Sequence, residues 1–351
     1  MDDNDVQWPA DGLEAVDFCP VCASPSRTLL YDGMRDVVFR TAPGEWKLYR
    51  CQGCQSCFLD PRPNIATVGL AYATYYTHAV NDQPIVRRIG AFRTVLHDLI
   101  NGYLNHRYGT ERVPANRAGR WLLPFLLPLR AVADVEFRHL PKPASPAHRV
   151  FDIGCGDGGF LARATGIGWV ASGIDPDPKA VANCKSRGID VALGGVDSLS
   201  SIEGSSYDYI TASHVLEHVH DPGKMLNEAF RLLRPGGILW LDTPNIQSLG
   251  HKRYRRFWRD LDAPRHLVLF NRTSLLQLLR RSGFTCIRQR NHSLRTFPIF
   301  AASEAIMQGK DAFSATRGGR PALTDILAEL YEMLWPRRRE FLTMTAIKPE
   351  G

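Results

Sequence analysis

The feature that most restricts how this chain folds is the stretch at residues 150–161, which reads VFDIGCGDGGFL. An apolar segment runs directly into a loop that contains four glycines. Gly154, Gly156 and Gly159 have the Gly-x-Gly-x-x-Gly spacing of a turn between a strand and a helix, where the backbone comes close to a bound ligand. Such a turn opens a β-α-β unit, so the stretch predicts a parallel sheet with crossover helices.

The chain after residue 149 alternates as this prediction requires. Asp221 and Pro222 provide a cap and a first-turn proline, which predict a helix start, and a second capped helix is expected over 273–284. Short apolar segments between helical ones predict an α/β fold. The expected strands are 149–154, 169–175, 189–195, 207–213, 238–244, 284–290 and 341–348.

Two carboxylates, Asp152 and Asp157, lie within the glycine-rich stretch. A pyrophosphate at the start of a helix needs backbone N–H donors, and neighbouring carboxylates repel it. A nicotinamide-dependent oxidoreductase is therefore disfavoured, although the glycine spacing fits one. A ligand with an ammonium and a sulfonium group is instead attracted to this loop, and S-adenosylmethionine is such a ligand.

The expected contacts with S-adenosylmethionine follow from where the strands end. Asp152, at the end of the first strand, is expected to accept from the ammonium group directly or through water. Asp175 ends the second strand, where a carboxylate accepts from both ribose hydroxyls. Asp197 follows the third strand and is expected to reach the adenine amino group. The expected cofactor-binding residues are Asp152, Gly154, Cys155, Gly156, Gly158, Asp175, Asp197 and Ser213.

Four motifs occur along the chain in this order: VFDIGCGDGGFL, GIDPDP, YDYITASHVLEHVHDP and LLRPGGILWLDTPN. Together they resemble a class I S-adenosylmethionine-dependent methyltransferase over residues 149–348. The resemblance implies an enzyme with a seven-stranded, Rossmann-like α/β sheet in which the last strand is antiparallel. It also implies S-adenosyl-L-methionine as the methyl donor.

Two Cys-x-x-Cys pairs lie near the start of the chain, Cys19 with Cys22 and Cys51 with Cys54. Each pair can turn two thiolates toward one ion, and two pairs complete the tetrahedral coordination of a structural zinc. No coordination position then remains open for catalysis. The sequence between the pairs alternates like short antiparallel strands, which predicts a zinc ribbon over 18–75.

The cysteine-rich region also resembles a known subgroup. The stretches CPVC and YRCQGCQSCFLDPRP, followed by a tyrosine-rich helix, resemble bacterial methyltransferases that carry an N-terminal zinc ribbon. Many members of this subgroup are found with glycan or natural-product pathways. Gln55 departs from the subgroup, in which the residue after the fourth cysteine is usually glycine.

Composition divides the chain into four parts. Residues 1–17 carry six acidic residues and no basic one, and they are expected to form a disordered tail. The zinc ribbon spans 18–75, a basic helical lid or linker region spans 76–145, and the methyltransferase domain spans 146–351. Within the helical region, the apolar stretch 121–135 is interrupted by two prolines and an arginine, and it is expected to be buried.

The expected compartment is the cytoplasm. The opening MDDNDVQWPADG has no signal-peptide pattern, and no stretch reaches the roughly 18 apolar residues of a membrane span. The net charge of +7 is unevenly placed, with basic runs at 85–149 and 251–259. Such runs can attract phosphate, nucleic acid or anionic membrane, although solvated helix faces are the commoner explanation.

Four residues near the expected cofactor site can carry acid–base chemistry. His214, Glu217 and His218 follow the fourth strand, at the edge where open α/β sheets bind ligands. His214 and His218 are four positions apart, which predicts one shared helical face beside Glu217. His266 lies on a later loop, in DAPRHLVLF. A hydroxyl acceptor must lose its proton to a general base or at a metal, so these residues are expected to be catalytic.

This set resembles the Glu-x-x-Glu-His site, with a distant histidine, of metal-dependent O-methyltransferases that act on ubiquinone precursors and on the ends of small RNAs. His214 replaces the first glutamate of that site, so a divalent metal is expected less than a general base. His218 and His266 are the expected bases. The alternative is that the segment only shapes the loop over the cofactor.

The sequence thus predicts a methyltransferase for a small-molecule or glycan-linked acceptor, at a hydroxyl group. An RNA methyltransferase is one alternative, since the ribbon and the basic helices can bind phosphates. It is disfavoured because the sequence has no recognisable RNA-binding module. A binding protein without activity is another alternative, and the intact glycine loop with Asp175 disfavours it. Nucleic acid is not an expected partner, whereas peripheral contact with an anionic membrane is left open.

Overall fold

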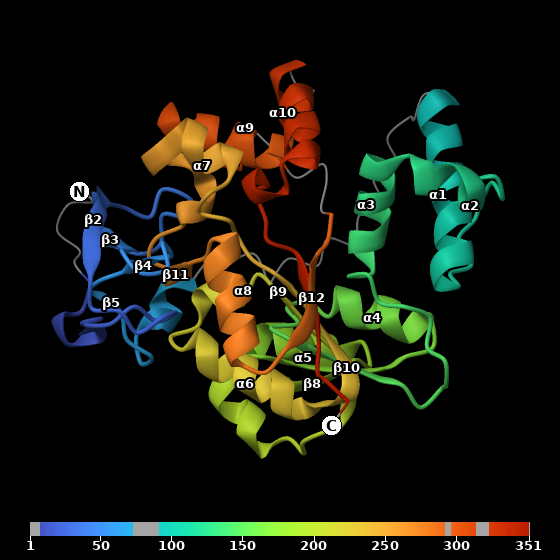
Figure 1. Ribbon diagram of the computed structural model, residues 1–351, viewed down its shortest axis with the longest axis horizontal. Coiled ribbons are helices and arrows are strands. Elements are labelled where there is room, and N and C mark those ends of the chain that lie inside the picture. Colours follow the sequence, from blue (N-terminus) through green and yellow to red (C-terminus); the bar gives the residue numbers. More distant parts are fainter. Residues whose placement is uncertain (1–7, 73–90, 292–295, 314–322, 351) are drawn as a thin grey trace.

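The computed structural model describes residues 8–72, 91–291, 296–313 and 323–350. Its central sheet contains the strands β6 (Arg149–Ile153), β7 (Val170–Asp175), β8 (Asp190–Leu193), β9 (Tyr207–Ser213), β10 (Leu233–Asp242), β12 (Thr285–Gln289) and β13 (Met344–Ile347) (Figure 1). The strand order is β12-β13-β10-β9-β6-β7-β8. The pairs from β10 to β8 are parallel, whereas β13 is antiparallel to both β10 and β12. The predicted seven-stranded fold with an antiparallel last strand is confirmed.

Crossover helices pack on the sheet. They are α4 (Gly159–Gly166), α5 (Pro178–Ser186), α6 (Pro222–Leu232) and α8 (Arg272–Arg281). Asp177 caps α5 and Asp221 caps α6, because each carboxylate accepts a backbone N–H of the first turn at 2.9 Å. Asn271 caps α8 with a reciprocal bond to Ser274. The predicted helix starts are therefore set by local side-chain chemistry.

The hydrophobic core continues from the central sheet into the cysteine-rich region. One large cluster of buried side chains joins Phe151 and Ile210 of the sheet to Leu48 and Phe58 near the cysteines. A smaller cluster on the other face of the sheet is centred on side chains such as Trp240. Because the two regions share one core, the cysteine-rich region is part of the same folded body as the sheet.

The cysteine-rich region forms its own antiparallel sheet. The strands are β2 (Arg27–Met34), β3 (Trp46–Cys51), β4 (Cys57–Leu59) and β11 (Val268–Leu269), in the order β11-β4-β3-β2. The strand β11 lies far beyond the predicted boundary at residue 75, and its Val268 pairs with Phe58 of β4. The segment that supplies this strand also carries His266. The ribbon is thereby tied to one of the predicted catalytic loops.

The segment before the first cysteine is ordered. The expectation of a disordered tail over 1–17 is wrong for residues 8–17, and the first seven residues lie outside the described ranges. Trp8 is buried against Trp46, with ring centroids 5.2 Å apart. The short strand β1 (Leu13–Glu14) pairs with β5 (Arg62–Pro63). Burial of the indole outweighs the acidic composition of this segment.

Three helices that follow the ribbon and precede the sheet in the sequence form a separate group. They are α1 (Ala91–Tyr108), α2 (Gly119–Leu122) and α3 (Leu127–Glu136). Figure 1 shows them beyond α4, on the side away from the ribbon. Trp121 and Phe125 are 66% and 84% exposed, so the expected burial of 121–135 is wrong for much of this stretch. Its prolines divide it into short helical pieces, each of which buries only one side. Among the described helices, none has the length and apolarity needed to cross a bilayer.

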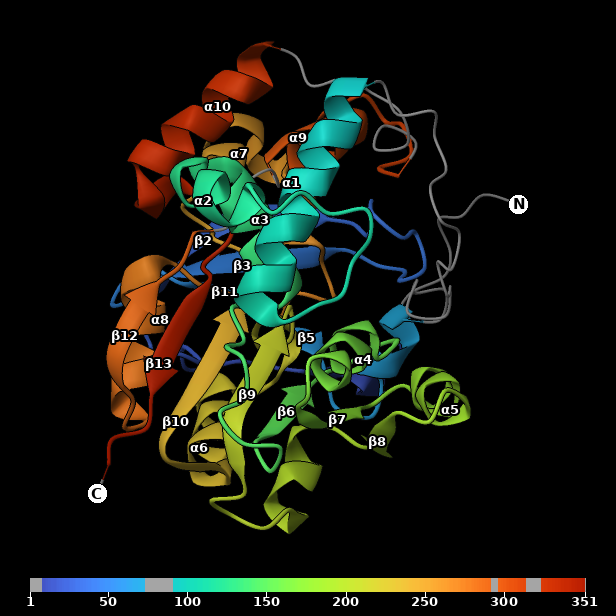
Figure 2. The ribbon, with the colours of Figure 1, turned by 90° about the vertical axis from the view of Figure 1, so that its right-hand side faces the viewer.

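The parallel strands end at one edge of the sheet, and other elements cover that edge. In Figure 2 the arrows of β9 and β10 point toward the ribbon strands and a group of helices. These helices include α7 (Leu249–Tyr254), α9 (Thr296–Met307) and α10 (Leu323–Leu334). Side chains that leave the ends of β6, β7, β9 and β10 therefore lie between the sheet and this covering layer, where open α/β sheets bind ligands.

Candidate active site

The glycine loop after β6 has the backbone conformation that the sequence predicts. Gly154, Gly156 and Gly158 have φ values of +69°, +54° and +73°, a region that glycine occupies without strain. A Cβ at Gly154 would lie 2.5 Å from Val215, and one at Gly158 would lie 2.8 Å from the Cys184 sulfur. A Cβ at Gly156 would meet no described atom within 4 Å, so the loop is open on that side.

Asp175 at the end of β7 ties the glycine loop to the neighbouring strand. Its carboxylate accepts from Gly156 N at 2.8 Å and from Asp177 N at 2.9 Å. A carboxylate has about four acceptor positions, so two remain for further donors. Burial raises the pKa of Asp175, and the two backbone N–H groups partly oppose that shift. The side chain is thus fixed in place with capacity to bind two hydroxyls.

Asp152 lies fully buried at the end of β6 and is paired with an arginine that the sequence analysis missed. Its Oδ1 contacts the guanidinium of Arg138 and accepts from Thr211 Oγ1 at 2.7 Å. Its Oδ2 has no hydrogen-bond partner among the described residues. Burial raises the pKa of Asp152, against the opposing charge of Arg138. The site therefore holds a carboxylate and a guanidinium together, and no ammonium is needed to neutralise Asp152.

Arg138 reaches this position from the segment after α3. Its guanidinium carbon lies 4.2 Å from the centre of the Phe160 ring, a cation–π contact. Arg138 and His139 have φ values of +49° and +56°, which are costly for residues with side chains. The local backbone strain is outweighed by the buried ion pair and the stacking. No motif marks Arg138, because its partners are distant in sequence.

The other expected cofactor contacts are dispersed. Asp197 begins the short helix η5 (Val196–Ser201), is largely exposed, and pairs with Lys224 of α6. Cys155 is buried, and burial raises the pKa of its thiol, so the sulfur is a packing group. Ser213 ends β9 in register with Asp242 of β10. These residues share the carboxyl edge of the sheet, but no contact in the structure joins them to Asp175.

Three of the four predicted catalytic residues meet after β9. Each of Glu217, His218 and His266 offers one atom that could bind a metal, and these three atoms lie within 4.8 Å of one another. The imidazole rings of His218 and His266 have centroids 4.8 Å apart. Glu217 is completely buried and accepts from Thr243 Oγ1 at 2.8 Å. Burial opposes its ionisation, but a hydrogen bond from His214 and the nearby imidazoles outweigh it and hold the pKa of Glu217 at about 2.

His214 does not share a helical face with His218, so that expectation is wrong. Only the short turn η6 (Leu216–His218) is helical, and His214 has φ +53°. Its backbone N–H donates to Asp242 O at 2.8 Å, which fixes the chain to the end of β10. Its ring lies between Glu217 Oε1, at 3.2 Å, and Asp242 Oδ2, at 3.4 Å. His214 therefore positions the buried glutamate.

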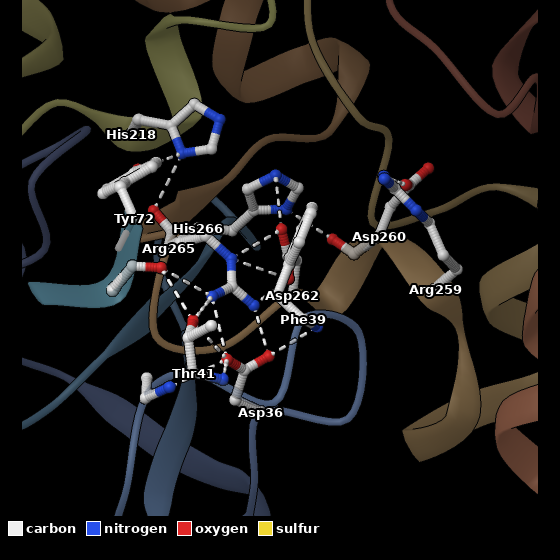
Figure 3. Close-up of polar contacts among 12 residues, drawn as sticks. Asp36, Phe39, Thr41, Tyr72, His218, Arg259, Asp260, Asp262, Arg265 and His266 are labelled. Carbon is white, nitrogen blue, oxygen red and sulfur yellow. Dashed lines mark hydrogen bonds and ion pairs between the residues drawn. The ribbon is translucent and has the colours of Figure 1, made fainter. Parts of the chain in front are cut away.

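The backbone fixes the same tautomer for both remaining histidines (Figure 3). His218 Nδ1 lies 3.0 Å from Arg265 O and 2.9 Å from Tyr72 Oη, and His266 Nδ1 lies 2.7 Å from Asp260 O. A carbonyl oxygen only accepts, so each Nδ1 carries a hydrogen, and in the neutral ring Nε2 then keeps a lone pair. Burial, followed by the charge of His266, lowers the pKa of His218 to about 4, so this ring is neutral near pH 7.

A buried ion pair from the ribbon holds the carbonyl that orients His218. Arg265 is fully buried, and Asp262 and Asp36 contact its guanidinium (Figure 3). The guanidinium also donates to Ala71 O at 2.9 Å and lies 4.3 Å from the Phe39 ring centre. Burial opposes ionisation of Asp36, but Arg265 holds the pKa of Asp36 at about 2. The sequence analysis missed this contact, because Asp36 and Arg265 lie in segments that only the fold brings together.

The four predicted zinc ligands also meet. Their sulfur atoms lie within 4.8 Å of one another, with Cys19 and Cys54 3.7 Å apart and Cys22 and Cys51 3.5 Å apart. Tetrahedral coordination at a zinc–sulfur distance of 2.3 Å requires sulfur separations of about 3.8 Å. Gln55 has φ +62°, a left-handed backbone conformation that glycine would adopt without strain. The cluster fits one tetrahedral metal ion.

Comparisons with known proteins identify a methyltransferase domain in this chain. A family model described as a methyltransferase domain matches residues 116–289. A ubiquinone biosynthesis O-methyltransferase from Xanthomonas campestris pv. campestris is 30% identical over 188 residues, which cover 47% of this chain and 78% of that protein. An uncharacterized 37.1 kDa protein in transposon TN4556 of Streptomyces fradiae is 37% identical over 114 residues, covering 30% of this chain and 33% of that protein.

Solved structures also resemble the chain. A phosphoethanolamine N-methyltransferase from Haemonchus contortus, solved in complex with S-adenosyl-L-methionine, is 17% identical with a TM-score of 0.45. The similarity covers 92% of this chain and 68% of that one.

Proposed function

The chain belongs to the class I S-adenosylmethionine-dependent methyltransferases, and on this premise we propose that it methylates a hydroxyl group of a small-molecule or glycan-linked acceptor. The cofactor supplies an electrophilic methyl group on its sulfonium sulfur. The observation that carries the proposal is the pair of Nε2 lone pairs on His218 and His266, next to the buried Glu217. A hydroxyl needs such a base, whereas an unprotonated amine does not. The ubiquinone biosynthesis relative is also named for transfer to oxygen.

We assign cofactor binding to the ends of β6 and β7. Asp175 has acceptor capacity for two ribose hydroxyls, and the open side of Gly156 gives a ligand access to the backbone. The amino-acid part of the cofactor carries an ammonium and a carboxylate, and Asp152 with Arg138 offers one partner for each. The unpartnered Oδ2 of Asp152 would accept from the ammonium. The loop residues 154–158, Asp197 and Ser213 complete the proposed site.

We assign proton removal to the two imidazoles. An acceptor hydroxyl beside them would donate its proton to the Nε2 atom of His218 or of His266. The neutral state of His218 suits a base, but a pKa of about 4 makes it a weak one near pH 7. The carboxylate of Glu217, ionised because its pKa is about 2, would stabilise the imidazolium that forms.

A divalent metal at Glu217, His218 and His266 is the alternative for the same step. Two imidazole nitrogens and one carboxylate are a known catalytic ligand set, and both Nε2 atoms carry lone pairs. The metal would lower the pKa of a bound hydroxyl. Brief chelation that leaves the cysteine site loaded distinguishes the two: it abolishes turnover if a metal is required and spares turnover if the histidines act alone.

We further propose that Cys19, Cys22, Cys51 and Cys54 bind a structural zinc. The sulfur separations support this assignment, and the buried position of the cluster leaves no role in catalysis. Elemental analysis is expected to find about one zinc per chain at this site. Cys51→Ser is expected to lower the melting temperature sharply. Metal-free protein that melts at an unchanged temperature would contradict the assignment.

We also propose that the protein acts in the cytoplasm and makes peripheral contact with an anionic membrane. The exposed side chains of Trp121 and Phe125 lie next to Arg117 and Arg120, a combination that suits the membrane interface. Wild-type protein should sediment with phosphatidylglycerol vesicles, and the double variant Trp121→Ser/Phe125→Ser should not. Equal sedimentation of the two proteins would refute this contact.

The experiment for the proposed function is transfer of a labelled methyl group from S-adenosylmethionine to panels of hydroxyl and amine acceptors. The account expects label in methyl ethers, with acceptors drawn from phenols and sugars. Label found solely in methylamines would overturn the assignment to oxygen. Titration calorimetry with S-adenosylmethionine and with NADH provides the cofactor control, since only the former is expected to bind.

A further inference from the structure

A cavity outside the candidate active site lies between the ribbon and the segment that follows β10. Its volume is about 380 Å³, and its walls come from β2, β3, the segment 246–248, α7 and the turn η10 (Pro336–Arg338). The side chains that decide its character are Tyr31, Arg50, His251, Lys252, Arg255 and Arg338. No acidic residue is among the residues that line it.

Four cations of this cavity lack carboxylate partners. Among the described residues, no ion pair joins Arg50, Lys252, Arg255 or Arg338 to an aspartate or glutamate, although many other arginines of the molecule have such partners. The guanidinium of Arg338 donates to Gln247 O at 3.1 Å. Four positive charges around a concave wall create a strongly positive potential, which favours an anion.

The positive charges of the cavity affect the pKa of His251, one of the residues that line it. Tyr31 Oη lies 3.0 Å from His251 Nε2. Burial lowers the pKa of His251 to about 4, and the charges of Arg50 and Arg255 add to this effect. The imidazole is therefore neutral near pH 7 and adds hydrogen-bonding capacity without charge. The charges of both arginines thus act on the same lining residue, Arg50 from β3 and Arg255 from the segment after α7.

The shape and chemistry of the cavity favour a small phosphorylated ligand. Planar guanidinium groups match phosphate oxygens in pairs, and the volume lies within the usual range of small-molecule pockets. A flat cationic face would suit a bilayer or a nucleic-acid backbone better than this hollow does. We propose that the cavity binds a phosphate or diphosphate ester and that, if the proposed function holds, this group is the charged end of the methyl acceptor.

The chain connects this cavity directly to the candidate active site. Thr243, which donates to Glu217, and Gln247, which lines the cavity, are four residues apart on one segment. Four residues of extended chain span at most roughly 14 Å. An acceptor with its phosphate in the cavity can thus extend its hydroxyl toward the histidine pair.

Calorimetry with inorganic pyrophosphate tests the anion site. The matched variants lie on the same short segment: Lys252→Gln/Arg255→Gln removes two cavity charges, and Arg253→Gln/Arg256→Gln removes two charges outside the cavity. The first double variant is expected to weaken pyrophosphate binding roughly 10- to 100-fold, whereas the second changes it less than roughly twofold. Absence of binding to wild-type protein, or equal weakening in both variants, would overturn the site. Arg50→Gln repeats the test with a cavity residue from β3.

Two further arms identify the source of the phosphate and separate this inference from the proposed function. Labelled methyl transfer into a small-molecule cell extract is expected to disappear after phosphodiesterase and phosphatase treatment of that extract; persistence would refute the phosphorylated acceptor. Phosphatidylglycerol vesicles that bind wild-type protein but not Lys252→Gln/Arg255→Gln, without pyrophosphate binding, would assign the site to lipid and overturn the proposal. Loss of S-adenosylmethionine binding in wild-type protein would defeat the proposed function while the pyrophosphate titration still decides the anion site.

Discussion

The cofactor side and the acceptor side of the candidate active site lie at the same sheet edge but are assembled differently. The cofactor side consists of the glycine loop with Asp152 and Asp175, and it is held by local bonds such as Gly156 N to Asp175 at 2.8 Å. The acceptor side consists of Glu217, His218 and His266. Its orientation depends on the carbonyl of Arg265, whose guanidinium is held by the ribbon through Asp36.

This difference separates binding from chemistry. Strand ends and a glycine turn build the cofactor side, and its polar contacts come from within the sheet domain and the segment just before it. The acceptor side needs a buried ion pair between segments more than two hundred residues apart, so it forms only when the ribbon is folded and docked. Damage to the ribbon should therefore reduce turnover before it reduces cofactor affinity.

Removal of the histidines should give the largest difference between the effect on turnover and the effect on cofactor affinity. His218→Ala and His266→Ala are each expected to lower the turnover rate by roughly 10²–10⁴, the usual worth of a general base. Cofactor affinity should stay near that of wild-type protein in calorimetry. His97→Ala, on the exposed side of α1, is the control. Full turnover in both active-site variants would mean that the residues of the acceptor side have only a structural role.

Asp36→Asn should show that the ribbon supports the acceptor side. Loss of one of its two carboxylate partners leaves the buried Arg265 with Asp262 alone and is expected to cost up to about 3–5 kcal/mol of unfolding free energy. The remaining folded protein should bind S-adenosylmethionine normally and turn over slowly. Asp32→Asn, at an exposed position of the ribbon, serves as the matched control. Unchanged turnover per folded molecule would mean that the ion pair contributes stability alone.

Asp175→Ala should affect the cofactor side instead. Loss of the hydrogen bonds to the charged carboxylate is expected to weaken S-adenosylmethionine binding by about 1–3 kcal/mol. Asp190→Ala, exposed on β8, should leave binding unchanged. Calorimetry measures both, and equal affinity in wild-type and Asp175→Ala protein would remove Asp175 from the site.

Acid should act on the two sides with opposite sign. The pKa of His218 is lowered to about 4 in the folded state, so the unfolded chain binds its proton first as the pH falls from about 6.5 toward 4. Stability is lost in that window by up to about 1.4 kcal/mol per pH unit. The pKa values of Asp152 and Asp175 are raised in the folded state, so the folded chain binds these protons before the unfolded chain does. Through these two groups, a fall in pH adds to the free energy of unfolding. Stability to urea between pH 7 and 5 should therefore change less with pH for His218→Gln than for wild-type protein, and equal pH dependence in the two proteins would contradict this account.

The same comparison explains what the sequence could predict. The strand segments, the glycine loop and the Asp221 helix cap depend on residues near one another in the chain, and the structure confirms the fold class built from them. The pairing of Arg138 with Asp152 depends on tertiary contact, and no pattern marks it. His214 shows the limit of spacing arguments, because its left-handed backbone overrides the helical period.

Composition was misleading where a few side chains decide the outcome. The acidic segment before the cysteines is ordered because Trp8 finds a pocket against Trp46. The apolar stretch at 121–135 leaves several large side chains exposed because its prolines divide it into short helical pieces. The convergence of Arg50, Lys252 and Arg255 on one cavity is likewise invisible until the ribbon is placed against α7.

The measurement that tests the central claim most directly is a crystal structure with S-adenosylhomocysteine. The account predicts the ribose on Asp175, the amino-acid group beside the Asp152–Arg138 pair, and the sulfur facing His218 and His266. The cofactor side and the acceptor side would then meet at the point of methyl transfer. Ligand density away from the glycine loop, or a sulfur turned away from both imidazoles, would contradict it.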